Sequence, residues 1–143
     1  MKTTNYDQLF INGQWVDSSS DQTITVLNPA TEEVIAAVPH ANEEDVDQAV
    51  AAAKQAFPDW NARPIRERSD LLLQLADAIE DHQDEILDLI IEEMGTAREF
   101  GKVAQVGRSI SEIRSLVAEL DNFKFKEDYK GFDVIKEGYG VVA

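Results

Sequence analysis

Residues 42–122 carry apolar side chains at the three- and four-residue spacing of amphipathic helices, and this feature constrains the fold most strongly. The first apolar stripe consists of Val46, Ala49, Val50, Ala53 and Phe57. Asn42 precedes this stripe as a helix cap, and the acids at 43–45 favour the positive end of a helix dipole. We therefore expect a helix that begins after Asn42 and ends at Pro58.

A second apolar stripe follows Pro64, a residue that the first turn of a helix tolerates. This stripe extends to Gly95, which is suited to the C-terminus of a helix. Because polar residues interrupt it around positions 81–84, the sequence predicts two consecutive helices here.

A further helix is expected over residues 96–122. Its apolar side consists of Val103, Val106, Ile110, Ile113, Val117 and Leu120. Gly101 and Gly107 lie inside this helix, and each costs about 1 kcal/mol relative to alanine. Their presence indicates that a neighbouring element packs closely at those turns.

The segments before and after the helices have β character. Asn12-Gly13 separates two short β-prone runs and predicts a type I′ hairpin. Four more segments follow from the pattern: strands at 23–28 and 33–39, a polar connection at 123–131, and a strand at 132–136. Another strand begins at Gly140 without being completed, so we expect the chain to be part of a larger α/β fold. The predicted order is a hairpin and short strands, three to four helices, and strands at the end.

Composition narrows the chemistry available to these residues. The 143 residues include no cysteine and only two histidines, which excludes a disulfide framework, a thiolate metal site and a cysteine nucleophile within them. A net charge of -15 repels phosphate backbones and anionic lipids, and this argues against nucleic-acid and membrane partners. No apolar run reaches the length of about 18 residues that marks a membrane span, and the first residues lack a secretory signal pattern. We therefore expect a cytoplasmic protein.

Short motifs in a fixed order cover nearly the whole chain. They are Phe10-Ile11-Asn12-Gly13, Asn28-Pro29-Ala30-Thr31, the alanine-rich run at 44–53, Arg66-Glu67-Arg68, Glu92-Glu93-Met94-Gly95 and the ending at 137–143. In this order and spacing they resemble the N-terminal part of the aldehyde dehydrogenase superfamily. Two positions depart from the family pattern, because Thr96 replaces a frequent lysine and Gly138 a frequent proline. The substrate class therefore stays open.

The resemblance implies a homo-oligomeric enzyme that oxidises an aldehyde to a carboxylic acid with NAD or NADP through a cysteine thiohemiacetal. Residues 1–122 would pack with the cofactor-binding domain, residues 123–137 would supply a connection and a strand of the oligomerisation domain, and residues 138–143 would begin a cofactor-domain strand. The catalytic thiol and the cofactor-binding residues would lie downstream. No catalytic or cofactor-binding residue is therefore assigned here, and the chain alone is expected to be inactive.

The resemblance also implies two sites within the chain. Family members often hold a monovalent cation with backbone carbonyls and a carboxylate, at the positions of Val26, Leu27 and Glu93. The mouth of the aldehyde tunnel corresponds to Ala104 and Arg108, where an arginine would favour an anionic aldehyde. The alternatives are a solvated acid at a helix end for Glu93 and a surface arginine for Arg108.

Other prominent side chains are expected to have structural roles. Arg66 and Arg68 are expected to pair with acids on neighbouring helices, while Trp15, Phe57 and Trp60 are expected to fill the core. Solvent-facing positions are expected for His40, His82 and the acidic stripe Glu80, Asp81, Asp84, Glu85 and Asp88.

A second hypothesis is a non-catalytic helical interaction or oligomerisation module that pairs through the strand edge at 132–136. The residues that follow Ala143 in the gene would distinguish the two hypotheses, because the enzyme needs a cysteine that this chain does not have.

Overall fold

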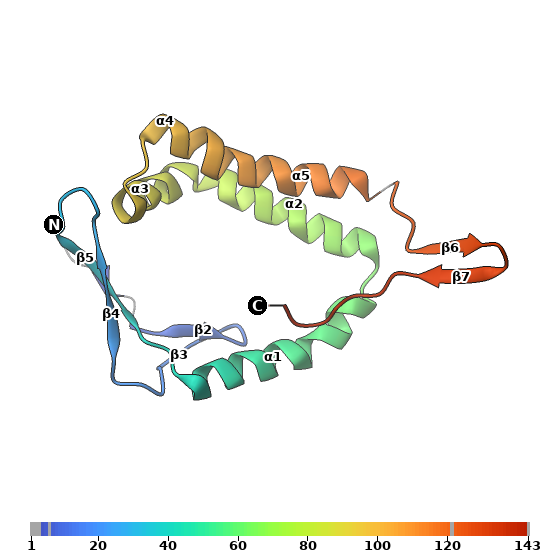
Figure 1. The fold of residues 1–143 in the computed structure, drawn as a ribbon, viewed down its shortest axis with the longest axis horizontal. Coiled ribbons are helices and arrows are strands. Elements are labelled where there is room, and N and C mark those ends of the chain that lie inside the picture. Colours follow the sequence, from blue (N-terminus) through green and yellow to red (C-terminus); the bar gives the residue numbers. More distant parts are fainter. Residues whose placement is uncertain (1–3, 6, 121, 143) are drawn as a thin grey trace.

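The computed structural model describes residues 4–5, 7–120 and 122–142 and has the α/β architecture that the sequence predicts (Figure 1). Its helices are α1 (Glu43–Ala62), α2 (Ile65–Asp81), α3 (Gln83–Met94), α4 (Arg98–Phe100), the π-helix η1 (Gly101–Gly107) and α5 (Arg108–Glu119). Its strands are β1 (Thr4–Asn5), β2 (Leu9–Ile11), β3 (Gln14–Val16), β4 (Thr23–Leu27), β5 (Val34–Pro39), β6 (Lys126–Tyr129) and β7 (Phe132–Ile135). In Figure 1, α2 and α5 lie side by side, α1 lies along the opposite edge, and the β6–β7 hairpin projects from one end.

The strands form three small sheets. In the largest, β5 is central, with β1 parallel and β4 antiparallel to it. The strands predicted at 23–28 and 33–39 are confirmed as β4 and β5. The predicted hairpin is confirmed as β2–β3, and Asn12 and Gly13 at its turn have the positive φ values, 53° and 74°, that a type I′ turn requires.

Asp45 anchors the start of α1 to the loop that follows β3. Asn42 caps the helix as predicted, and the Asn42 side chain accepts a hydrogen bond from the Asp45 N–H while the Asp45 carboxylate accepts one from the Asn42 N–H. The same carboxylate accepts from Ser18 Oγ at 2.6 Å and from the Ser19 N–H at 2.9 Å. The Ser18 hydrogen bond is the main reason that the pKa of Asp45 falls to about 2, and Asp45 is only 3% exposed. The sequence predicted only that Asp45 lies in the first turn of the helix, whereas the structure shows that its buried carboxylate also binds the loop after β3.

The prediction that α1 ends at Pro58 is wrong, because the helix continues to Ala62 with Pro58 inside it. Proline removes one backbone hydrogen bond but leaves the other turns able to form. The helix ends where Arg63 precedes Pro64 and becomes extended, with ψ of 141°. A residue directly before proline disfavours the helical conformation, so Pro64 is the effective stop.

The core lies between α2, α3, η1 and α5. Its buried apolar residues are Ala76, Leu87, Val106 and Ile110, with five isoleucines packed around them: Ile79, Ile86, Ile90, Ile91 and Ile113. The predicted break between α2 and α3 is confirmed at His82, and the predicted stop at Gly95 is confirmed by its left-handed φ of 67°. No helix within 4–5, 7–120 or 122–142 is long and apolar enough to cross a membrane.

The ion pairs between α2 and α5 are formed by Arg114 and not by Arg66 or Arg68, the two arginines expected to pair with acids. Arg114 on α5 donates to Asp77 Oδ1 at 2.8 Å and to Glu80 Oε2 at 2.5 Å, both on α2. Neither Arg66 nor Arg68 pairs with an acid within the described ranges, and Arg68 Nε is buried there without a partner. The ion pairs between helices were predicted for Arg66 and Arg68 of α2, but Arg114 of α5 forms them.

The helix predicted over 96–122 forms as α4, η1 and α5, and its middle turns are π-helical. The Arg108 N–H donates to the carbonyl oxygen of Val103, five residues back. Gly101 and Val106 are both buried, although residues five apart would lie on different faces of a regular α-helix. The wider π-turn brings them to the same side and turns Val103 outward, where it is 69% exposed. The prediction that Val103 belongs to the apolar side is therefore wrong.

The close packing predicted at the two helix glycines is confirmed at Gly101. A Cβ atom there would lie 2.8 Å from Leu87 Cδ1 on α3. At Gly107 the nearest atom would be the carbonyl oxygen of Lys102 at 3.0 Å, which belongs to the same π-helix. The prediction of a neighbouring element at Gly107 is wrong, because the crowding there comes from the π-turn itself.

The polar connection predicted at 123–131 contains a strand. β6 pairs antiparallel with β7, and Lys126 forms an ion pair with Asp133 at 2.7 Å across the two strands. Lys130 and Gly131 at the turn both have positive φ, so a lysine occupies a conformation usually taken by asparagine or glycine. The strand predicted from Gly140 is not formed by residues 140–142, and Ala143 lies outside the described residues.

Two of the three aromatic residues expected in the core are on the surface. Trp15 is 63% exposed and packs against the Phe10 ring with 5.0 Å between centroids. Trp60 is also exposed, whereas Phe57 is partly buried. The predicted solvent-facing residues are confirmed as exposed: His40, His82, Glu80, Asp81, Asp84, Glu85 and Asp88.

The lowered pKa of Asp45 predicts an acid-sensitive contribution to stability. The unfolded chain takes up the proton near the ordinary value of 3.8 and the folded chain near about 2, so the stabilisation is present above 3.8 and is lost as pH falls through about 2. We expect Asp45→Asn to lower the melting temperature at neutral pH, with a difference from the parent chain that shrinks in acid. Thermal melts at several pH values measure this difference. Asp47→Asn, at an exposed acid of the same helix, is the control, and a constant difference for Asp45→Asn across pH would contradict the prediction.

The π-helix predicts an unusual tolerance to a one-residue deletion. Removal of exposed Lys102 leaves Gly101 and Val106 four residues apart, so a regular α-helix can bury both. We expect this variant to keep a cooperative denaturant transition. Removal of exposed Ser111 instead rotates Ile113 and the residues beyond it by about 100°, and we expect a loss of about 2–5 kcal/mol in the free energy of unfolding. Equal losses for the two deletions would contradict the assignment.

Candidate functional site

The residues assigned to a cation site come from two elements that meet through Pro29 and Gly95. Val26 and Leu27 end β4, and Glu93 lies in the last turn of α3. A Cβ atom on Gly95 would lie 3.1 Å from Pro29 Cγ, so the loop after β4 packs directly against the end of α3. This contact brings segments separated by more than sixty positions to one place.

The local backbone at this place offers oxygen atoms. The pairing of β4 with β5 shifts between Val26, which faces Ala36, and Leu27, which faces Val34. Such a bulge disrupts the ladder of backbone hydrogen bonds and redirects its polar groups. The carbonyl end of α3 carries the negative end of the helix dipole, and its last turn contains no basic residue. The neutral carbonyls and one acid therefore suit a single positive charge.

Side-chain ligands alone would not build a metal centre here. Within the part of the chain that the structure describes, no three His, Cys, Asp or Glu side chains gather as possible metal ligands. Glu93 itself is exposed at the end of α3.

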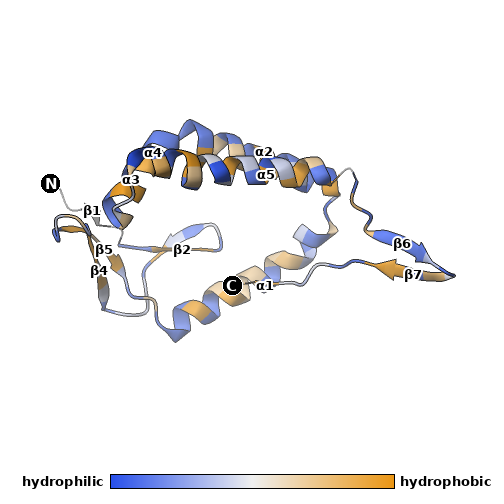
Figure 2. Ribbon diagram, turned by 45° about the horizontal axis from the view of Figure 1, so that its top comes forward, coloured by the Kyte–Doolittle hydropathy of each residue, from blue (hydrophilic) through white to orange (hydrophobic). Residues whose placement is uncertain are grey.

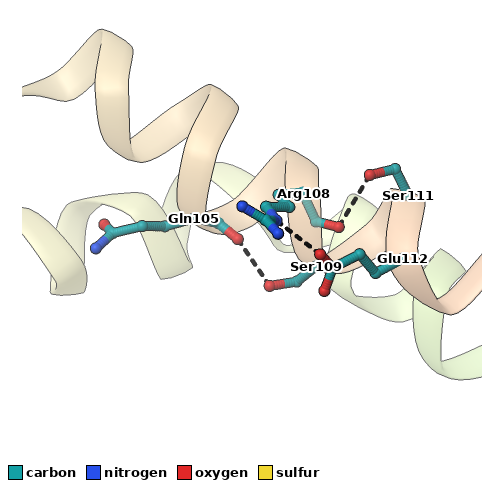
Figure 3. A network of polar contacts seen from close by, with 5 residues as sticks. All are labelled: Gln105, Arg108, Ser109, Ser111 and Glu112. Atoms are coloured by element: carbon teal, nitrogen blue, oxygen red, sulfur yellow. Dashed lines mark hydrogen bonds and ion pairs between the residues drawn. The ribbon is translucent and has the colours of Figure 1, made fainter.

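Ala104 and Arg108, the two residues assigned to the tunnel mouth, lie on the π-helix and at the start of α5. Ala104 is half-buried and Arg108 is exposed. Arg108 Nε donates to Glu112 Oε1 at 2.6 Å, one turn further along the helix (Figure 3). This hydrogen bond raises the pKa of the Arg108 guanidinium above its ordinary value. The cation of Arg108 is therefore already balanced by Glu112.

Hydroxyl groups complete the polar network around Arg108. Figure 3 shows Ser109 Oγ donating to the carbonyl oxygen of Gln105 at 2.7 Å and Ser111 Oγ donating to that of Arg108 at 2.9 Å. Serine hydroxyls that bond back to helix carbonyls tend to bend a helix, and here they border the π-helical turns.

Gln105 lies on the π-helix beside Ala104, and the sequence alone did not single it out. Its Oε1 atom is buried without a hydrogen-bond partner in the described ranges, and its Nε2 atom lies 4.0 Å from Met94 Sδ. A buried acceptor without a partner costs about 1–3 kcal/mol, so this amide is expected to receive a donor from water or from another segment. A glutamine beside an apolar helical stripe gives no sequence signal for a buried Oε1 atom, because that burial depends on tertiary packing.

Comparison with known proteins gives the family. The sequence profile described as "Aldehyde dehydrogenase family" matches residues 15–143. An inferred aldehyde dehydrogenase of Staphylococcus haemolyticus is 34% identical over 137 residues, which is 96% of this chain and 29% of that protein. The chain thus spans less than a third of the length of the curated relatives it matches.

Solved structures agree with this assignment. An aldehyde dehydrogenase from Bartonella henselae superposes with a TM-score of 0.85 at 29% identity, over 90% of this chain and 27% of that one. Aldehyde dehydrogenase C from Pseudomonas syringae, solved with NAD+ and octanal, superposes with a TM-score of 0.85 at 31% identity, over 89% and 26%. The NAD+ complex from Mycobacterium tuberculosis gives 0.82 at 30% identity, over 88% and 26%. The strands, helices and motifs described above therefore assign this chain to the aldehyde dehydrogenase family.

Proposed function

We propose that this chain forms part of an NAD(P)-dependent enzyme that oxidises an aldehyde to a carboxylic acid. The match to the aldehyde dehydrogenase family over residues 15–143 is the observation that supports this most strongly. In the proposed reaction a cysteine thiolate adds to the aldehyde carbonyl, and the resulting thiohemiacetal loses a hydride to become a thioester that water hydrolyses. NAD(P)+ accepts the hydride when it is bound.

The described residues would support this chemistry without performing it. The chain contains no cysteine, so the nucleophile must come from outside these residues. We propose that residues 1–122 pack with the cofactor-binding domain and that residues 138–143 lead into one of its strands. The exposed apolar residues of α1 and α2, including Val46 and Leu71, are available for that packing.

The β6–β7 hairpin would contribute to a homo-oligomer. All eight residues of its two strands are exposed, and Figure 2 shows an apolar β7 beside a polar β6. A two-stranded hairpin is marginally stable alone, and its unpaired edges are suited to strand addition. We propose that residues 123–137 supply the connection and this strand of the oligomerisation domain.

We propose that a monovalent cation binds between the carbonyls of Val26 and Leu27 and the carboxylate of Glu93. The Pro29–Gly95 contact, the register shift between β4 and β5 at Val26 and Leu27, and the carbonyl end of α3 support this proposal. The cation would hold the loop after β4 against the end of α3.

We also propose that Ala104 and Arg108 line the mouth of the aldehyde tunnel. The small side chain of Ala104 leaves room beside the helix, while Arg108 is engaged by Glu112 at 2.6 Å. An anionic aldehyde would have to compete with that carboxylate for the guanidinium group.

The activity proposal is tested on the complete product of the gene. We expect aldehyde-dependent formation of NAD(P)H with a kcat of about 1–1000 s⁻¹, whereas the 143-residue chain alone gives no turnover because it has no thiol. Absorbance of NAD(P)H measures both reactions. Turnover by the chain alone would contradict the assignment of the chemistry to other residues. A complete product that lacks aldehyde oxidation but assembles through the hairpin would favour the interaction module instead.

The cation proposal is tested by the salt dependence of thermal stability. We expect KCl or NaCl to raise the melting temperature more than choline chloride at equal ionic strength. Glu93→Gln removes one charge from the site, and we expect the half-saturating cation concentration to rise about tenfold. Glu92→Gln, at the adjacent acid of α3, is the matched control and should keep the parent response. Identical responses of the two variants would leave Glu93 as a solvated acid at a helix end.

A further inference from the structure

The end of α3 brings a sulfur atom beside a side-chain amide of the π-helix. Met94 is the last residue of α3, and its side chain is 62% exposed. Its Sδ atom lies 4.0 Å from Nε2 of Gln105, eleven positions further along the chain. This contact is weak, because a thioether sulfur is a poor hydrogen-bond acceptor. We propose that Met94 is a modification site, at which a hydroperoxide oxidises the thioether to a sulfoxide.

The oxidation transfers one oxygen atom and two electrons between Met94 and the hydroperoxide. An electron pair of Sδ attacks one peroxide oxygen, so that the S–O bond forms while the O–O bond breaks. The other oxygen takes up the proton and leaves as water or as an alcohol. The reverse step uses two thiols, which become a disulfide while the oxygen leaves as water. None of this depends on the aldehyde chemistry proposed above.

The Gln105 amide gives the sulfoxide a hydrogen-bond partner. Its Oε1 atom is buried, 3.6 Å from where a Cβ atom on Gly101 would lie, so Nε2 is the end of the amide that faces Met94. Figure 3 shows this side chain extending away from Arg108. An oxygen added to Sδ lies within the 4.0 Å gap and accepts from Nε2 more strongly than sulfur does.

The consequence of oxidation is a new link between α3 and η1. These two elements already touch where Leu87 meets Gly101. A sulfoxide in an apolar core disrupts packing, but Met94 is exposed, so the added oxygen keeps contact with water while it accepts from Gln105. Oxidation of Met94 therefore fastens the end of α3 to the π-helix, and reduction releases it.

The test uses hydrogen peroxide on the complete gene product. Peptide mass mapping measures how fast Met94 gains one oxygen atom, and we expect a rate within about tenfold of that in the urea-unfolded protein, because the side chain is accessible. Hydrogen exchange measured by mass spectrometry then reports on residues 95–107. We expect their backbone amides to exchange about threefold more slowly after oxidation, the effect of one added hydrogen bond.

Two variants separate the modification from its effect. Met94→Leu cannot take up oxygen, so its exchange at residues 95–107 should not respond to peroxide. Gln105→Leu removes the Nε2 donor together with the buried Oε1 atom that has no partner in the described ranges, so this variant should fold and be oxidised at Met94 without slower exchange.

The outcomes decide between a modification site and an inert side chain. Oxidation of Met94 with slower exchange in the parent only supports the inference. Oxidation more than about a hundredfold slower than in the unfolded protein overturns it, because Met94 is then shielded. Exchange that does not slow in the parent, or that slows equally in Gln105→Leu, overturns the proposed link. Each outcome is independent of whether the complete gene product oxidises an aldehyde.

Discussion

The packing of α2 against α5 around Ala76 fixes the helical half of the molecule. Ala76 is fully buried, and Leu87, Val106 and Ile110 complete the buried apolar cluster between these helices. Val106 and Ile110 are held in this core and Gly101 is held against Leu87, so two buried positions lie five residues apart. A wider helical turn accommodates this spacing, and the π-helix thus satisfies both contacts. The outward orientation of Val103 follows from this constraint.

The β end depends on a different kind of interaction. There the buried carboxylate of Asp45 joins the loop after β3 to the start of α1 through hydrogen bonds from Ser18, Ser19 and Asn42. Hydrogen bonds to a charged group are stronger than neutral ones, and they fix direction as well as distance. Trp15 remains on the surface of the β2–β3 hairpin, so apolar burial contributes less here than at Ala76. Apolar packing thus stabilises the helices around Ala76, whereas hydrogen bonds to a carboxylate that titrates in acid stabilise the junction at Asp45.

The features of this fold that the sequence predicted correctly are caps and turns, whose conformation depends on local backbone chemistry. The cap at Asn42, the turn at Asn12-Gly13 and the left-handed Gly95 each depend on neighbouring residues only. Features set by distant contacts could not be read in this way. Val103 has the spacing of a buried residue, and only the packing of Gly101 against Leu87 shows why it is exposed. For the candidate sites, the resemblance supplied the residues, whereas the meeting of Pro29 with Gly95 and the buried Oε1 atom of Gln105 required the three-dimensional structure.

The proposed cation site and the proposed tunnel mouth at Ala104 and Arg108 lie at the two ends of one short connection. Gly95 ends α3 and contacts Pro29, and α4 begins only three residues later at Arg98. Two further contacts join α3 to the π-helix: Leu87 against Gly101, and Met94 beside the amide of Gln105. A cation that held Glu93 and the loop after β4 in place would restrain α3 from its C-terminal end. The helix that carries Ala104 and Arg108 packs on α3, so a restraint on one would limit the movement of the other. We therefore infer that α3, rather than a chain of polar groups, would link the two proposed sites.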